Sequence, residues 1–437
     1  MQSVHPRETP ALVFASKEGE ILDYSGLSMA GRSGDSFFRP RSEELIPLPE
    51  GSELFLLPGR MPVGIEPGSD EPALLAEDPY RPGEPVQAVA AFMAPAHTAV
   101  YTAAYQSRPD APLLPLFAYT AVGWLDGRFW VTGFRSDPDP RQDSDRFDPT
   151  LIRRRTAERL GRFPDNRLIQ HLGKCCLTYG CPAARNYFLD RWEAPLPSSP
   201  TCNAACAGCI SLQPSGCCPA SQERIRFVPS PEELSQVAIP HLEKNPRPVV
   251  SFGQGCEGEP LLQAETLEQA IQAFRAATRR GTINLNTNGS LPDRVERLAR
   301  AGLDSIRISL NSSRSSYHRR YYRPKSDGFS LSDVCRSMQI MKEYDRHVSL
   351  NYFVLPGFTD DPEEFDALSA LIEQYRPDLI QLRNLNMDPE YYLRVVQHTP
   401  GGRPMGILRW LAALKKRFPD LEFGYFNPCL DKTCEES

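Results

Sequence analysis

The chain has 437 residues, of which 41% are apolar and 24% charged, so it reads as a globular protein too long for a single core. Its net charge of −6 disfavours a nucleic acid as partner. The opening residues lack the basic-then-apolar order of a secretion signal, and the longest uncharged run is too polar for a membrane span. We therefore expect a cytoplasmic protein with two or three domains.

Cysteine is concentrated in one part of the chain. None of the twelve cysteines precedes Cys175, and nine of them fall between Cys175 and Cys256. Because no export signal is recognised, the thiols are expected to stay reduced. Their grouping therefore indicates local metal chemistry instead of disulfide bonds across the whole fold.

Residues 1–148 are expected to form a β-rich accessory domain of unknown role. Strands are predicted at short apolar runs bounded by Gly, Pro or Asp, namely 11–15, 53–57 and 128–132. Asp126-Gly127 is a turn pair that predicts a hairpin between the runs 122–125 and 129–131.

Residues 149–195 are expected to form a helical connector. This segment carries Cys175, Cys176 and Cys181, and adjacent cysteines are unusual in a reducing compartment. Two interpretations stay open for them. They are either small buried apolar side chains or ligands of a second metal site.

From residue 196 onward, helix and strand patterns alternate. After a short first strand, which Pro195, Pro197 and Pro200 interrupt, strands are predicted at 248–252, 283–286, 305–310, 348–354 and 379–382. Repeated βα units require parallel strands with helices packed outside. The predicted fold is therefore α/β, with a partial (βα)6 TIM-like barrel and a C-terminal extension over residues 196–437. Chemistry in such folds gathers at the carboxyl ends of the strands.

Three cysteines, Cys202, Cys206 and Cys209, follow the first predicted strand with the spacing C-x3-C-x2-C. Three thiolates this close in sequence can bind one metal centre, but they leave a four-coordinate cluster one ligand short. A closed structural site uses four protein ligands, whereas an open position admits a substrate or cofactor. The spacing therefore predicts an open iron–sulfur site.

Polar groups follow the next three predicted strands. Gly253 to Gly258 spells G-x-G-x-x-G, but Glu257, Glu259 and Pro260 suit a dinucleotide pyrophosphate poorly. We interpret Gly258-Glu259-Pro260 instead as a strand tip, where backbone oxygens can approach a ligand and the acid can pair with an amine. Hydrogen-bonding groups suited to ribose or a carboxylate end the next two strands, namely Thr287, Asn288, Ser309 and Asn311.

In this order, the motifs resemble the radical S-adenosylmethionine (radical SAM) superfamily. They are most similar to the branch that contains enzymes of molybdopterin-precursor and nitrogenase-cofactor biosynthesis. The segment 354–361 is similar to the adenine-contacting segment of that branch, whereas Gly208 stands where the family often has an aromatic residue. The resemblance covers residues 196–385.

The resemblance implies that Cys202, Cys206 and Cys209 bind a [4Fe–4S] cluster whose fourth iron takes the amine and carboxylate of S-adenosylmethionine. It assigns cofactor contacts to Gly258, Glu259, Pro260, Thr287, Asn288, Ser309, Asn311 and Leu355. It names no catalytic residue beyond the cluster ligands.

The implied reaction is reductive cleavage of S-adenosylmethionine to a 5′-deoxyadenosyl radical, which abstracts hydrogen from a small-molecule or peptide substrate. A reductase, flavodoxin or ferredoxin would supply the electron. The alternative is a non-catalytic iron–sulfur or zinc protein that uses the βα domain as a scaffold.

The other cysteines leave room for an auxiliary iron–sulfur cluster. Its candidate ligands are Cys175, Cys176, Cys181, Cys217, Cys218, Cys429 and Cys434. Cys335 lies on an apolar helical face and is expected to fill the core. The basic and aromatic segment 317–325 is interpreted either as a solvated loop or as a contact for substrate or a cofactor carboxylate.

Overall fold

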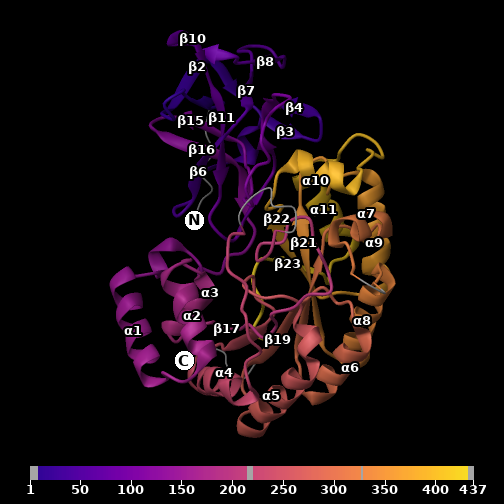
Figure 1. The fold of residues 1–437 in the computed structure, drawn as a ribbon. Helices are drawn as coiled ribbons and strands as arrows, with labels where there is room; N and C mark the ends of the chain where they lie inside the picture. Colours follow the sequence, from indigo (N-terminus) through magenta and orange to yellow (C-terminus); the bar gives the residue numbers. More distant parts are fainter. Residues whose placement is uncertain (1–7, 214–219, 326–327, 432–437) are drawn as a thin grey trace. The chain divides into compact units, whose positions relative to one another are not determined.

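The computed structural model describes residues 8–213, 220–325 and 328–431 (Figure 1). The chain divides into two compact units. The first contains residues 1–138, 353–369 and 382–419, and the second contains residues 139–352, 370–381 and 420–437. The domain boundaries expected at residues 148 and 195 stay predictions.

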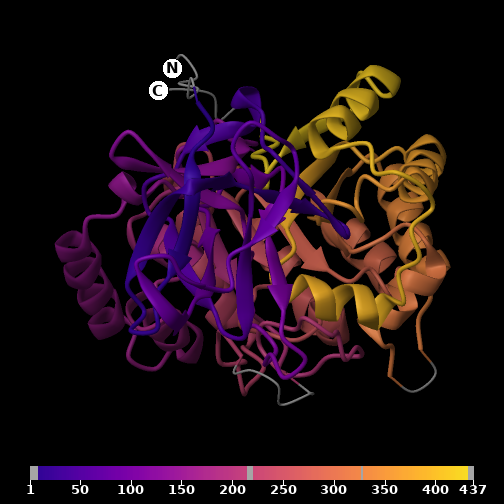
Figure 2. The ribbon, with the colours of Figure 1, turned by 90° about the horizontal axis from the view of Figure 1, so that it is seen from above.

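The N-terminal part of the first unit is built from short, mostly antiparallel strands (Figure 2, indigo to purple). They are β1 (Ala11–Ala15), β2 (Ile21–Met29), β3 (Gly31–Ser33), β4 (Ser36–Phe38), β5 (Leu45–Pro47), β6 (Glu53–Leu57), β7 (Arg60–Ile65), β8 (Pro72–Leu74), β9 (Glu77–Asp78), β10 (Arg81–Pro85), β11 (Gln87–Phe92), β12 (His97–Ala99), β13 (Thr102–Ala103), β14 (Tyr105–Ser107), β15 (Val122–Leu125) and β16 (Arg128–Arg135). The three strands predicted in this region are confirmed as β1, β6 and β16.

The predicted hairpin is also confirmed. β15 pairs antiparallel with β16, and both turn residues have positive φ, 52° at Asp126 and 72° at Gly127. Positive φ at both positions matches the right-handed twist of the flanking strands. Val13, Val89 and Val131 from three of the strands pack together in one buried cluster, and burial of such side chains stabilises the sheet.

Ion pairs and hydrogen bonds join these strands to residues 382–419 within the first unit. Arg60 lies 2.7 Å from Asp388, and both side chains are at most 3% exposed. Arg32 lies 2.9 Å from Glu390, which stands two residues after Asp388. The elements here are α10 (Pro389–Val396) and α11 (Ile407–Arg417), and α9 (Pro362–Tyr375) runs from the first unit into the second.

Three helices form the connector that opens the second unit, namely α1 (Pro149–Arg162), α2 (Arg167–Leu177) and α3 (Pro182–Phe188). The Asp148 side chain caps α1 by accepting from the N–H of Leu151, and the Asn166 side chain caps α2 by accepting from the N–H of Ile169. The predicted helical character of this segment is confirmed.

The barrel sheet has seven strands in sequence order, β17 to β23. They are β17 (Glu193–Leu196), β18 (Val249–Phe252), β19 (Thr282–Thr287), β20 (Ser305–Leu310), β21 (His347–Val354), β22 (Leu379–Asn384) and β23 (Glu422–Gly424). The pairs from β17 through β21 are parallel, as predicted. β23 is a seventh strand that the sequence pattern did not predict. β17 is short and lies at the sheet edge, where Pro195 leaves no central hydrogen bond unmade.

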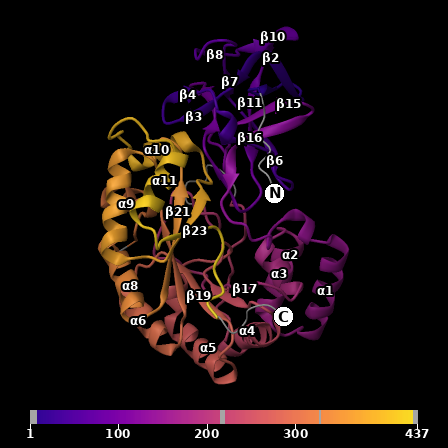
Figure 3. The same ribbon diagram turned by 180° about the vertical axis from the view of Figure 1, so that it is seen from behind.

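Helices line the outside of this sheet (Figures 1 and 3). They are α4 (Pro231–Lys244), α5 (Ala264–Ala277), α6 (Pro292–Ala301) and α8 (Leu331–Glu343). α7 (Ser315–Tyr322) is shorter and follows β20. Within the described residues, no helix combines the length and apolarity that a membrane span requires.

A buried polar row crosses the middle of the sheet. The strand register places Ser251, Asn284 and Ser305 side by side on β18, β19 and β20. Ser305 Oγ donates to Asn284 Oδ1 at 2.8 Å, and Asn284 Nδ2 donates to Ser251 Oγ at 3.2 Å. Asn427 extends the row by donating to Glu193 Oε1 at 2.8 Å. Because buried polar groups need partners, these bonds favour a single register.

Candidate active site

The cysteine loop begins six residues after β17. Burial raises the pKa of Cys202 to about 11, with a further contribution from the nearby Glu259 carboxyl group. Burial also raises the pKa of Cys206 well above its ordinary value, and Cys202 and Cys209 add to that effect. The three thiols are therefore close enough to influence one another. A cationic centre would supply the positive charge that three thiolates need in this buried loop.

The number of these thiols suits a cluster better than a closed single-ion site. A closed structural ion uses four protein ligands, whereas this loop offers three cysteines. A cluster spreads its cysteine ligands over several irons. The donor set therefore fits a [4Fe–4S] cluster with one iron left open.

Backbone hydrogen bonds hold the cysteine loop against the end of α7. The N–H of Ala205 donates to the carbonyl of Tyr322 and that of Ala207 to the carbonyl of Tyr321, both at 3.0 Å. The N–H of Lys325 donates to the carbonyl of Asn203 at 2.9 Å. The interpretation of 317–325 as a solvated loop is therefore wrong, because most of it is a helix whose aromatic side chains are buried. A substrate contact by this segment stays a prediction.

Gly258 brings the segment after β18 against the chain that leads into the cysteine loop. Its N–H donates to the carbonyl of Ser199 at 2.7 Å, and the N–H of Glu259 donates to that of Thr201 at 2.8 Å. A Cβ atom on Gly258 would lie 1.9 Å from the Thr201 carbonyl oxygen. Gly253 has φ +77° and is packed as closely against Asn286. Backbone packing therefore explains both glycines without a dinucleotide.

The Glu259 side chain joins the ends of β18 and β19. Its carboxylate accepts hydrogen bonds from Thr287 Oγ1 and from the N–H groups of Asn288 (2.9 Å) and Leu261 (3.0 Å). Burial raises the pKa of Glu259 to about 7 against the opposing effect of these donors. Both carboxylate oxygens thus have partners inside the chain. This arrangement favours a structural role for Glu259 over the expected pairing with an amine.

Asn203 links the cysteine loop to the end of β19. Asn288 Nδ2 donates to Asn203 Oδ1 at 2.9 Å, and Asn203 Nδ2 donates to Ser290 Oγ at 2.8 Å. The N–H of Ser290 donates back to Asn288 Oδ1 at 3.0 Å. Sequence reasoning missed Asn203 and Ser290. The signal that could have found Asn203 is its place inside the cysteine motif.

Comparison with known proteins agrees with this geometry. Residues 196–368 match the family described as the radical SAM superfamily. Over these residues, the chain is similar to the radical SAM superfamily, as its motifs led us to expect. It is 27% identical over 200 residues to GTP 3′,8-cyclase of Mycobacterium ulcerans (strain Agy99), which covers 46% of this chain and 48% of the relative. The chain thus spans about half the length of this curated relative.

Two solved structures are also similar to parts of this chain. The anSMEcpe structure with bound AdoMet has 16% identity and a TM-score of 0.35, covering 45% of this chain and 51% of that one. The [FeFe]-hydrogenase maturase HydG from Carboxydothermus hydrogenoformans has 15% identity and a TM-score of 0.37, with coverage of 63% and 69%.

Two further side chains of the radical SAM domain lie beside the third cysteine. Arg224 Nη2 lies 3.5 Å from Cys209 Sγ, and Ser211 Oγ lies 3.7 Å from the same sulfur. Arg224 also donates to Ser211 Oγ at 3.0 Å. Donors near a cluster sulfur stabilise the thiolate and influence the reduction potential. Sequence reasoning missed both residues, since neither stands in a recognisable motif.

Glu257 fixes the chain just ahead of the cysteine loop. Its buried carboxylate accepts from the N–H groups of Ser198 (2.8 Å), Ser199 (2.9 Å) and Gln254 (2.6 Å). Burial raises the pKa of Glu257 to about 7 despite these donors. In the sequence, Glu257 serves only as an argument against a pyrophosphate site. Its structural role becomes visible in the fold.

The remaining predicted contacts are placed as follows. Ser309 is half-buried near the end of β20, and Asn311 is fully buried, donating to the Tyr317 carbonyl at 3.4 Å. Leu355 is buried after β21 and belongs to the first unit. Pro260 begins a 3-10 turn that precedes α5. The cofactor roles of all these residues stay predictions.

Among the described candidate auxiliary cysteines, Cys175, Cys176 and Cys181 lie near one another, and the N–H of Cys181 donates to the carbonyl of Cys175 at 3.1 Å. Cys176 Sγ lies 3.5 Å from Thr156 Oγ1 on α1, and Cys429 Sγ lies 3.8 Å from the Pro248 carbonyl. Cys335 is buried on α8, as expected for core filling. Cys217, Cys218 and Cys434 lie outside the described residues. An auxiliary iron–sulfur cluster built from this set stays a prediction.

Proposed function

We propose that the chain is a radical SAM enzyme in which Cys202, Cys206 and Cys209 bind a [4Fe–4S] cluster. One observation carries the proposal. The three-cysteine loop is tied by hydrogen bonds to the ends of two neighbouring parallel strands, β18 and β19, whose segments carry the Gly258-Glu259-Pro260 and Thr287-Asn288 motifs. A cluster bound to these cysteines and the groups expected to contact S-adenosylmethionine would therefore share one edge of the sheet.

When bound, the cluster and S-adenosylmethionine supply one-electron cleavage that yields a 5′-deoxyadenosyl radical. The chain's own residues would bind and orient S-adenosylmethionine and would exclude water from the site. Three donors from the chain already surround the Glu259 carboxylate, and we propose that backbone oxygens of the segment 258–260 accept from the methionyl amine. Asn203 would keep the cysteine loop in register with Asn288.

The substrate is proposed at the level of its class, a small molecule or a peptide. A reductase, flavodoxin or ferredoxin is proposed as the electron donor. The similarity to GTP 3′,8-cyclase supports the chemistry of the shared radical SAM domain. Because only about half of that relative is spanned, we do not extend its nucleotide substrate to this chain.

Binding of S-adenosylmethionine separates an enzyme from a passive iron–sulfur protein. The anaerobically reconstituted and reduced chain should bind S-adenosylmethionine, and its cluster EPR spectrum should change on addition, because the open iron gains ligands. Equilibrium dialysis with labelled S-adenosylmethionine gives the stoichiometry, and S-adenosylhomocysteine serves as a competitor. A chain with an intact, reducible cluster that binds no S-adenosylmethionine would support the non-catalytic alternative.

A further inference from the structure

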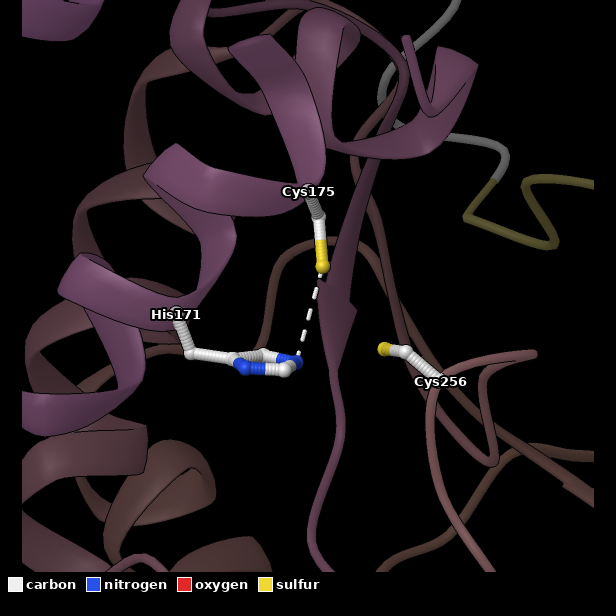
Figure 4. A group of neighbouring side chains, drawn as sticks. All are labelled: His171, Cys175 and Cys256. Carbon is white, nitrogen blue, oxygen red and sulfur yellow. Dashed lines mark hydrogen bonds between the residues drawn. The ribbon is translucent and has the colours of Figure 1, made fainter. Parts of the chain in front are cut away.

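A second group of metal-ligating side chains lies outside the cysteine loop, within the second unit. His171 and Cys175 are one turn apart on α2, and Cys256 stands on the loop after β18 (Figure 4). One ligand atom from each lies within 4.8 Å of the others, and it is the one such group of three in the described part of the chain. Figure 4 shows the imidazole and the Cys256 thiol directed toward the same space as Cys175 Sγ.

The local fold accounts for this convergence. Residues i and i+4 of a helix share a face, so His171 and Cys175 are presented together. Cys176, the next residue, is directed instead to Thr156 on α1. Cys256 is held from the other side, because its carbonyl accepts from the N–H of Ile225 at 2.7 Å. Two separate elements therefore contribute ligands to one point.

The distance between the two α2 ligands matches a single ion, and Cys256 Sγ lies within 4.8 Å of both ligand atoms. Cys175 Sγ lies 3.5 Å from His171 Nε2. In a tetrahedral zinc site, bonds of about 2.3 Å to sulfur and about 2.0 Å to nitrogen place neighbouring ligand atoms about 3.5–3.8 Å apart. A cluster would hold these cysteines on different irons and therefore farther apart. Two thiolates would also balance the charge of a divalent ion, at a site where both cysteines are at most 5% exposed.

We propose that His171, Cys175 and Cys256 bind one thiophilic divalent ion, zinc in the cell, with water in the fourth position, and that this ion fixes α2 to the loop after β18. Cys256 directly precedes Glu257, whose carboxylate holds Ser198 and Ser199 ahead of the cysteine loop. The ion would therefore position the loop that supports the radical SAM site without taking part in its chemistry. The proposal stands independently of the proposed enzymatic activity.

Element analysis tests the site in a chain that cannot hold the cluster. With Cys202, Cys206 and Cys209 all changed to Ser, the purified protein should retain about one zinc per chain. Adding Cys256→Ser or His171→Ala should reduce zinc at least fivefold. The matched controls are Cys176→Ser, adjacent on α2, and Cys335→Ser, a buried cysteine elsewhere, and both should keep zinc. Loss of zinc from the chain that lacks only the three cluster cysteines would overturn the proposal.

X-ray absorption at the zinc edge tests the same site in the wild-type holoenzyme, where iron at the cluster does not interfere. The expected shell contains nitrogen at about 2.0 Å from zinc and sulfur at about 2.3 Å from zinc. An all-sulfur shell, the absence of zinc, or a Cys175–Cys256 disulfide in the intact mass would each contradict the assignment. Failure of S-adenosylmethionine cleavage with zinc retained would count against the proposed function alone.

Discussion

Changing any one of Cys202, Cys206 and Cys209 to Ala should abolish formation of 5′-deoxyadenosine by the reconstituted chain. Each thiol would hold one iron, so loss of one leaves the cluster with two protein ligands and no defined open position. The expected result is at least a hundredfold lower rate together with a fall in iron from about four per chain. Iron analysis and anaerobic product chromatography measure the two quantities.

The matched control for this loss is Cys335→Ala. Cys335 is buried on α8 away from the cysteine loop, and its truncation should leave iron content unchanged. A cluster-cysteine variant that keeps full iron and full 5′-deoxyadenosine formation would contradict the assignment of that ligand.

Changing Glu259 to Gln should lower the free energy of unfolding by about 1–3 kcal/mol at pH 5, because a side-chain N–H₂ would then face a backbone donor. Burial raises the pKa of Glu259 from 4.5 to about 7. The folded wild type therefore binds more protons than the unfolded chain between these values, and this group's contribution to stability falls as pH rises through that window. The Gln variant lacks this dependence, so the difference between the two proteins should shrink toward pH 8.

Urea unfolding of the cluster-free chain from pH 5 to pH 8, followed by circular dichroism, measures this effect. Glu265→Gln is the matched control, since Glu265 is exposed in the first turn of α5. Its effect should be a few tenths of a kcal/mol, from the lost charge near the helix N-terminus. An equal pH dependence in wild type and Glu259→Gln would show that Glu259 is not the group responsible.

Local patterns predicted the strands β17 to β22 and the cysteine loop, whereas they missed β23. Strands such as β19 and β20 alternate apolar and polar side chains between turn residues, and three prolines correctly predicted that β17 would be short. The positions of the polar motifs at strand ends follow from the parallel order of the strands. These patterns do not predict which hydrogen-bond or ion-pair partner each side chain finds.

The partners come from distant parts of the chain. Asn203 meets Asn288 across 85 residues of sequence, and Glu257 meets Ser198 across 59. Cys256 was hidden inside a glycine pattern, and His171 belonged to no motif, so the second metal group could not be assembled from spacing alone. Likewise, the buried pair Arg60–Asp388 joins residues 328 positions apart, which no periodicity predicts.

The most direct test of the central claim is product formation by the wild-type chain. Reconstituted under anaerobic conditions and mixed with dithionite and S-adenosylmethionine, it should form 5′-deoxyadenosine and methionine in equal amounts, and neither without reductant. A chain that holds about four irons and binds S-adenosylmethionine, yet releases neither product, would contradict the radical SAM mechanism.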